Sequence, residues 1–144
     1  MTERVAALLM LSLFAGACNH EATSATVEWQ GYVLQEVQSL RQIPAPLQSS
    51  LGVDRPGLEG IADRGRPFNR TDVVDERLPR RRFLVAGHTG DTWLIAVERG
   101  GRAYSVEVFL FGGETLRPTK TWVLLDRPDT LREVVRLIAQ RETA

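Results

Sequence analysis

The carboxyl-terminal half of the chain alternates apolar segments with glycine-containing breaks. Segments rich in Val, Ile, Leu, Phe, Tyr and Trp, which favour β-strands, lie at 82–86, 92–98, 103–111 and 119–125. The breaks between them contain the glycines that tight turns require, at 87–91, 99–102 and 112–114. This pattern predicts a four-stranded antiparallel meander. The second segment is apolar on both faces, which indicates a central strand.

The last segment of the chain predicts an amphipathic helix. Its apolar residues recur at helical spacing, at Leu131, Val134, Val135 and Ile138. Pro128 suits a first helical turn, and Asp126 or Asp129 can cap the amino terminus.

A second helix is predicted over residues 26–43. One helical face would carry Trp29, Val33, Val37 and Leu40, and Pro44 would end the helix. However, residues 27–29 also alternate as a strand would, and Gly31 weakens a helix. Both interpretations of this segment stay open.

These elements together predict an α+β fold, in which the four-stranded antiparallel meander packs against an N-terminal and a C-terminal helix. One domain over residues 26–144 accommodates them. Residues 44–82 contain proline and glycine too often for long elements, and such a long irregular segment in a small domain is either functional or flexible.

The amino terminus has the order of parts found in export signals. Arg4 precedes an apolar run over residues 5–17, which ends in small residues just before Cys18, the only cysteine. The run would cover only about 20 Å of a hydrocarbon core roughly 30 Å thick, which disfavours a membrane-spanning helix. A plain secretory signal cut near Ala17 and a buried amino-terminal helix are also compatible with this run.

The segment Phe14-Ala15-Gly16-Ala17-Cys18 resembles the lipobox of bacterial lipoproteins, with Ala15 where leucine is commonest. The resemblance implies that residues 1–17 are a signal peptide, that Cys18 carries acyl chains such as palmitate, and that residues 18–25 are a polar tether. It also implies a periplasmic, membrane-anchored protein. Asn19, which follows the cysteine, is compatible with the outer membrane, and we favour that membrane over the inner one.

Composition narrows the possible partners. The chain has 18 basic and 18 acidic side chains, so no overall field attracts nucleic acid, and we expect no nucleic-acid partner. With Cys18 used for lipid, no disulfide is possible, and packing alone must stabilise the domain. The expected partners are therefore the membrane, through Cys18, and an envelope protein.

Residues with potential chemistry are few. The cluster Arg77, Arg80, Arg81 and Arg82 can recognise carboxylates or phosphates of a partner, although Asp72, Asp75 and Glu76 upstream can neutralise it internally. His88 and Asp91 can form a base oriented by a carboxylate, yet a glycine-rich turn explains the same residues. Two histidines and one cysteine offer no transition-metal site, and no nucleotide-binding motif occurs, so no catalytic residue, metal or cofactor is predicted.

Two functions follow from these observations. The first is a non-enzymatic envelope lipoprotein that binds another protein, as an assembly subunit or as an inhibitor of the immunity type. The alternative is a small periplasmic hydrolase or ligand-binding protein that uses the turn with His88 and Asp91.

Overall fold

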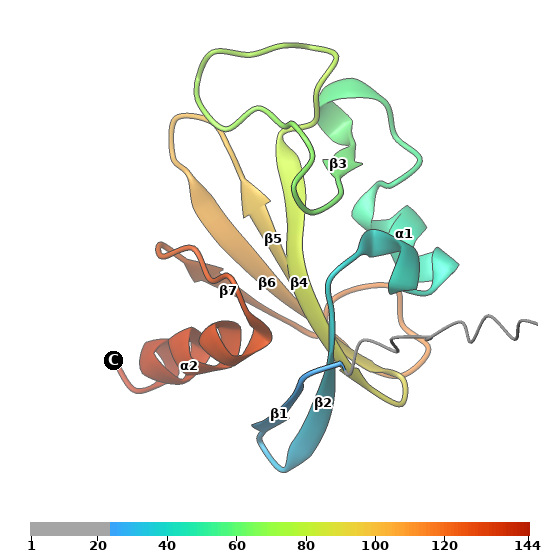
Figure 1. The fold of residues 1–144 in the computed structure, drawn as a ribbon, viewed down its shortest axis with the longest axis vertical. Helices are drawn as coiled ribbons and strands as arrows, with labels where there is room; N and C mark the ends of the chain where they lie inside the picture. The colour runs from blue at the N-terminus through green and yellow to red at the C-terminus, as the bar shows by residue number, and fades with distance from the viewer. Residues whose placement is uncertain (1–23) are drawn as a thin grey trace, which may run out of the picture.

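A single antiparallel sheet organises the chain, and an α-helix covers each of its faces (Figure 1). The computed structural model describes residues 24–144. Its strands are β1 (Thr26–Trp29), β2 (Tyr32–Val37), β3 (Ile61–Ala62), β4 (Arg81–Thr89), β5 (Thr92–Arg99), β6 (Ser105–Phe111) and β7 (Lys120–Leu124). Its α-helices are α1 (Ala45–Leu51) and α2 (Leu131–Glu142). The strand order is β1-β2-β4-β5-β6-β7, and the short β3 pairs in parallel with the start of β4.

The predicted four-stranded meander packed against two terminal helices is wrong. The strands β4 to β7 overlap the four predicted segments, but the sheet in the described residues has seven strands. The segment predicted as the N-terminal helix forms β1, β2 and a short 3₁₀ turn instead. The described residues contain two α-helices, but the first is the seven-residue α1, which lies within the segment expected to be irregular.

The turn between β1 and β2 explains the missing helix. Gln30 and Gly31 both have positive φ angles, of 48° and 82°, as a two-residue turn of a β-hairpin requires. In this hairpin Trp29 is buried, whereas Val33 is 57% exposed. A helix would have placed both side chains on one face, so the helical spacing of these residues is coincidental.

The central strands are buried on both faces because their side chains alternate between two cores. On β5, Trp93, Ile95 and Val97 point towards α1, whereas Leu94 and Ala96 point towards α2. A one-residue bulge at Leu84 shifts the register between β4 and β5. Its effect falls on the end of β4 that carries the arginines.

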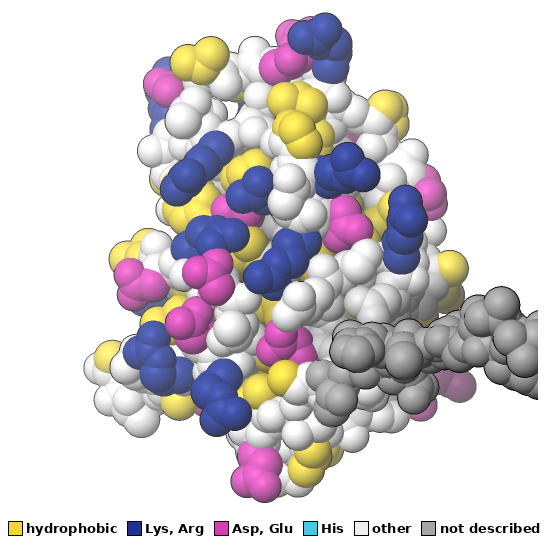
Figure 2. All heavy atoms as spheres, viewed as in Figure 1, with side chains coloured by type: hydrophobic (Ala, Val, Ile, Leu, Met, Phe, Trp, Pro, Cys, Tyr) yellow, Lys and Arg dark blue, Asp and Glu magenta, His cyan; other side chains and the backbone are white. Residues whose placement is uncertain are grey.

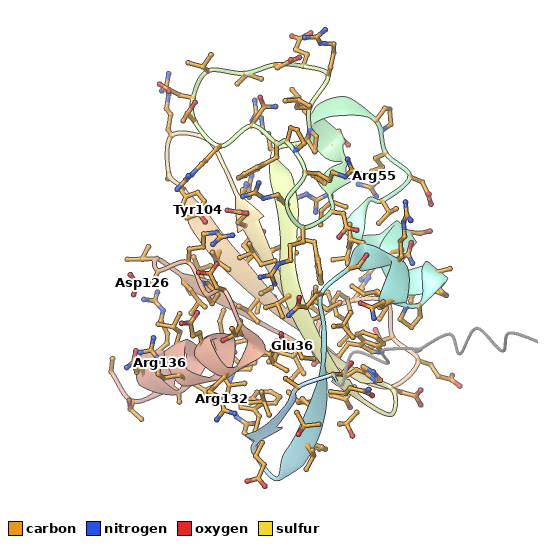
Figure 3. The ribbon with its side chains drawn as sticks, in the orientation of Figure 1. Glu36, Arg55, Tyr104, Asp126, Arg132 and Arg136 are labelled. Carbon is orange, nitrogen blue, oxygen red and sulfur yellow. The ribbon has the colours of Figure 1, made fainter. Side chains whose placement is uncertain are left out.

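Three hydrogen bonds fix the start of α2. The hydroxyl of Thr130 accepts from the backbone N–H of Glu133, and the Glu133 carboxylate accepts from the N–H of Asp129. This is a variant of the capping box, and the cap is Thr130 rather than the predicted Asp126 or Asp129. The carboxylate of Glu36, on β2, also accepts from the N–H of Leu131 at 3.1 Å and lies beside this first turn (Figure 3).

The loop between β3 and β4 is held by one buried side chain, that of Asn69. Its amide donates to the carbonyls of Asp75 and Leu78 at 2.8 and 2.7 Å, and its oxygen accepts from the N–H of Asp75. The N–H of Gly100 then donates to the carbonyl of Arg80, which ties the loop to the end of β5. Much of the irregular segment is therefore a packed loop.

Candidate functional site

The structure divides the predicted arginine cluster between three environments. Arg77 is exposed and pairs with Asp75 at 2.8 Å. Arg81 and Arg82 are neighbours on β4, so their side chains point to opposite faces of the sheet. Arg80 and Arg81 line a pocket on the face that carries α1, whereas Arg82 lies on the face that carries α2.

The pocket on the α1 face has a volume of about 290 Å³ and contains four arginines. Arg80 and Arg81 come from the start of β4, and Arg99 lies opposite Arg81 at the end of β5. Arg55 comes from the loop after α1, and Figure 3 shows it on the other side of the strand ends from Tyr104. The carboxylates in the lining belong to Glu59 and Glu107. We call these six residues the arginine pocket.

Only part of the positive charge in the arginine pocket is paired. Arg81 donates to the backbone carbonyl of Glu59 at 3.0 Å, and Arg99 lies 3.5 Å from the carboxylate of Glu107. Within residues 24–144, the guanidinium groups of Arg55 and Arg80 form neither a hydrogen bond nor an ion pair. Their donors are free to bind an anion.

The surroundings of Arg81 weaken its hold on its proton. Burial is the main cause that lowers the pKa of its guanidinium, and the positive charges of Arg55 and Arg99 act in the same direction, against Glu107 and Glu59. The guanidinium stays charged, because an arginine does not deprotonate in proteins. The pocket therefore holds a positive charge in an unfavourable environment that a bound anion would improve.

A second network lies on the opposite face of the same strand ends. The carboxylate of Glu98 is fully buried and accepts from Arg82 Nε at 2.6 Å and from the Tyr104 hydroxyl at 2.7 Å. Arg127 approaches it to 3.6 Å, and the Arg82 guanidinium lies 4.3 Å from the ring centroid of Phe68. The network joins two strands, the Asn69 loop and the segment before α2. Both oxygens of Glu98 already accept a hydrogen bond, so we assign the network a structural role.

Alkaline titration provides a test of the Glu98 network. Burial, followed by the hydrogen bond to Glu98, raises the pKa of Tyr104 from 10.0 to about 12. Because the folded state holds this proton more tightly, the contribution to stability is complete below pH 10.0 and declines as the pH rises towards about 12. We expect the free energy of unfolding of the wild type to fall more steeply over this range than that of Tyr104→Phe. Parallel curves for the two proteins would contradict the assignment.

Charges elsewhere do not form a continuous basic surface on the visible face. Figure 2 shows Lys and Arg side chains interspersed with Asp and Glu over this face. Such an arrangement is typical of solvated charges that neutralise one another, and it gives no extended field for a polyanion.

The residues of the alternative site, His88 and Asp91, occupy a strand and a turn respectively. His88 lies in β4 rather than in the turn, and its ring stacks on Trp93 with centroids 4.5 Å apart. In the described part of the chain, His88 and Asp91 share no hydrogen bond. Both lie at the end of β4 and β5 opposite to the arginine pocket.

Neither a cluster of metal-ligating side chains nor a membrane-spanning helix occurs among the described residues. No group of three or more His, Cys, Asp or Glu side chains there is placed to hold a metal ion. No helix of residues 24–144 is both long and apolar enough to cross a membrane. Cys18 and the predicted signal peptide lie outside the described residues.

Comparisons with known proteins returned no relative. No family model matches the chain, and neither the curated proteins nor the solved structures contain a significant match.

Sequence reasoning found part of the arginine pocket but not its composition. Arg80 and Arg81 belong to the predicted cluster, whereas Arg55, Arg99 and the two glutamates were not predicted. Strand alternation already separates Arg81 from Arg82 and is the signal that could have divided the cluster.

Proposed function

We propose that this chain is a cell-envelope lipoprotein without catalytic activity that binds another protein through its arginine pocket. One observation carries the proposal: the guanidinium groups of Arg55 and Arg80 are unpaired beside two further arginines. Solvated surface arginines usually stand alone or pair with a carboxylate, whereas a group of four with free donors suits recognition of an anionic partner. An assembly subunit or an inhibitor of the immunity type fits this description.

The position of the pocket favours a protein over lipid headgroups as the partner. The carbonyl of Ala25 accepts from the N–H of Glu36, which pairs with Gly87 near the far end of β4. Arg81 lies six residues before Gly87, or roughly 20 Å at about 3.3 Å per residue. Ala25 therefore lies at the end of the sheet that is remote from the pocket. A lipid on Cys18, seven residues before Ala25 in the sequence, would attach the chain nearer to this end than to the pocket.

The anchor itself is tested by mass spectrometry of the mature chain. We expect a chain that begins at Cys18 and carries acyl chains, and that partitions into detergent because each buried CH₂ contributes about 0.8 kcal/mol. Cys18→Ala is expected to remain unprocessed or to lose the lipid. An unmodified wild-type mass would exclude lipidation.

Partner binding is tested by chemical cross-linking of the full chain in the cell envelope. We expect a stoichiometric cross-linked product with the wild type that is lost when Arg55→Gln and Arg80→Gln are combined. The matched control combines Arg132→Gln with Arg136→Gln, which removes the same charge from the exposed face of α2 (Figure 3). A product that survives in the pocket variant, or disappears equally in the control, argues against this function.

A further inference from the structure

The charge balance of the arginine pocket differs from that of the whole chain. The chain carries equal numbers of basic and acidic side chains, whereas the pocket contains two more arginines than carboxylates. Among the described residues, Arg99 is the one arginine of the pocket with an ion pair, and the guanidinium groups of Arg55 and Arg80 form no hydrogen bond either. A ligand with two negative charges would neutralise the excess of arginines.

The arginines of the pocket differ in burial and in hydrogen bonding. Arg81 is half-buried and bonded to the carbonyl of Glu59, and its Nη2 lies only 2.8 Å from the place that a β-carbon on Gly52 would occupy. Arg55 and Arg80 are exposed, so their long side chains can extend to contact a ligand. Arg81 thus lies at the base of the pocket, and the guanidinium groups of Arg55 and Arg80 can bind an anion from its exposed edge.

The two glutamates restrict which anion is accepted. The carboxylates of Glu59 and Glu107 line the same pocket and repel any ligand with a long run of negative charge. A nucleic-acid backbone is therefore disfavoured. A volume of about 290 Å³ suits one or two side chains rather than a larger polyanion.

We infer that the arginine pocket binds two neighbouring carboxylates on an acidic segment of a partner protein. This inference rests on the proposed function, because the choice of a protein segment over a free anion follows from that function. Each carboxylate pairs with one free guanidinium group at the rim, and Arg81 bonds to both from below. Planar guanidinium groups match carboxylates in this way by paired N–H···O bonds.

The test uses the full chain in detergent and a short flexible peptide with two adjacent glutamates. Its affinity is compared with that of the same peptide carrying glutamines, by fluorescence anisotropy at low salt. We expect the glutamine peptide to bind at least about tenfold more weakly, and the combination of Arg55→Gln and Arg80→Gln to cause a loss of similar size. The combination of Arg132→Gln and Arg136→Gln is expected to leave the affinity within about twofold. Circular dichroism verifies that the variants fold.

Three results would overturn the inference. These are equal binding of the two peptides, an equal loss of affinity in the α2 control, and inorganic phosphate that binds more tightly than the glutamate peptide. The third result would assign the pocket to phosphate groups. Failure of the proposed function is distinguishable, because it gives peptide binding without a cross-linked envelope partner. A cross-linked partner that tolerates the pocket substitutions refutes the pocket inference and leaves a partner-binding protein.

Discussion

Glu98→Ala is expected to lower the free energy of unfolding by about 3 kcal/mol, towards the lower end of the range for breaking a buried ion pair. The carboxylate of Glu98 is fully buried, whereas the Arg82 side chain that it binds is 19% exposed. Its removal leaves the Arg82 guanidinium and the Tyr104 hydroxyl without their acceptor. Water reaches Arg82 in part, which is why the lower end of the range applies. Urea denaturation followed by tryptophan fluorescence measures the loss.

Two further variants make this expectation specific. Glu98→Gln keeps the shape and an acceptor oxygen but removes the charge, so its loss should be smaller than that of alanine. Glu107→Ala removes a carboxylate that lies 3.5 Å from an arginine 55% exposed, and we expect less than about 1 kcal/mol. Similar losses for Glu98→Ala and Glu107→Ala would show that the buried network does not stabilise the fold.

The strands β4 to β7 were predictable because their signals are local. Apolar segments of strand length alternate with glycine-containing turns, and each turn can be predicted from its own residues without reference to a distant part of the chain. The segment from 26 to 43 carries conflicting local signals instead. Pairing of β2 with β4 decides between them, and this contact joins residues about 50 positions apart in the chain.

The bulge at Leu84 explains why the sequence shows that Arg81 and Arg82 lie on opposite faces but not which face each one occupies. A regular hairpin that continued the pairing of Thr89 with Thr92 would place Arg82, rather than Arg81, opposite Arg99 and on its face of the sheet. The extra residue shifts the register, so that Arg82 lies opposite Glu98 and Arg81 opposite Arg99. The charge pattern of both faces therefore depends on one irregular residue in a continuous apolar run.

The pocket also needs Arg55, whose position depends on the loop after α1. Gly60 allows this loop to turn back on itself, because a β-carbon there would lie 2.4 Å from the carbonyl oxygen of Arg55. Sequence spacing gives no hint that Arg55 approaches β4, since β3 must first pair with the start of that strand. The position of Arg55 therefore depends on a tertiary contact, the pairing of β3 with β4.

Gly100→Ala is expected to destabilise the protein by about 3 kcal/mol, at the upper end of the usual range for overpacking. A β-carbon at this position would lie 1.8 Å from the carbonyl oxygen of Asn69 and 2.7 Å from the α-carbon of Arg70. Both are backbone atoms that cannot rotate away, so the loop has to separate from the end of β5. That separation breaks the hydrogen bond from the Gly100 N–H to the Arg80 carbonyl and strains the hydrogen bonds around Asn69.

Gly112→Ala is the matched control for this substitution, because a β-carbon there has no neighbour within 4 Å and the φ angle is an ordinary one. We expect a change of less than about 0.5 kcal/mol for it. Hydrogen exchange distinguishes detachment of the loop from a general loss of stability. Relative to the wild type, Gly100→Ala should accelerate exchange of the Asp75 N–H, which is bonded to Asn69, more than exchange of the N–H groups of β5 and β6. The Arg80 backbone is bonded to Gly100, so the same variant should also displace Arg80 and weaken binding of the glutamate peptide. Unchanged exchange at Asp75 would mean that the loop does not depend on the absence of a side chain at residue 100.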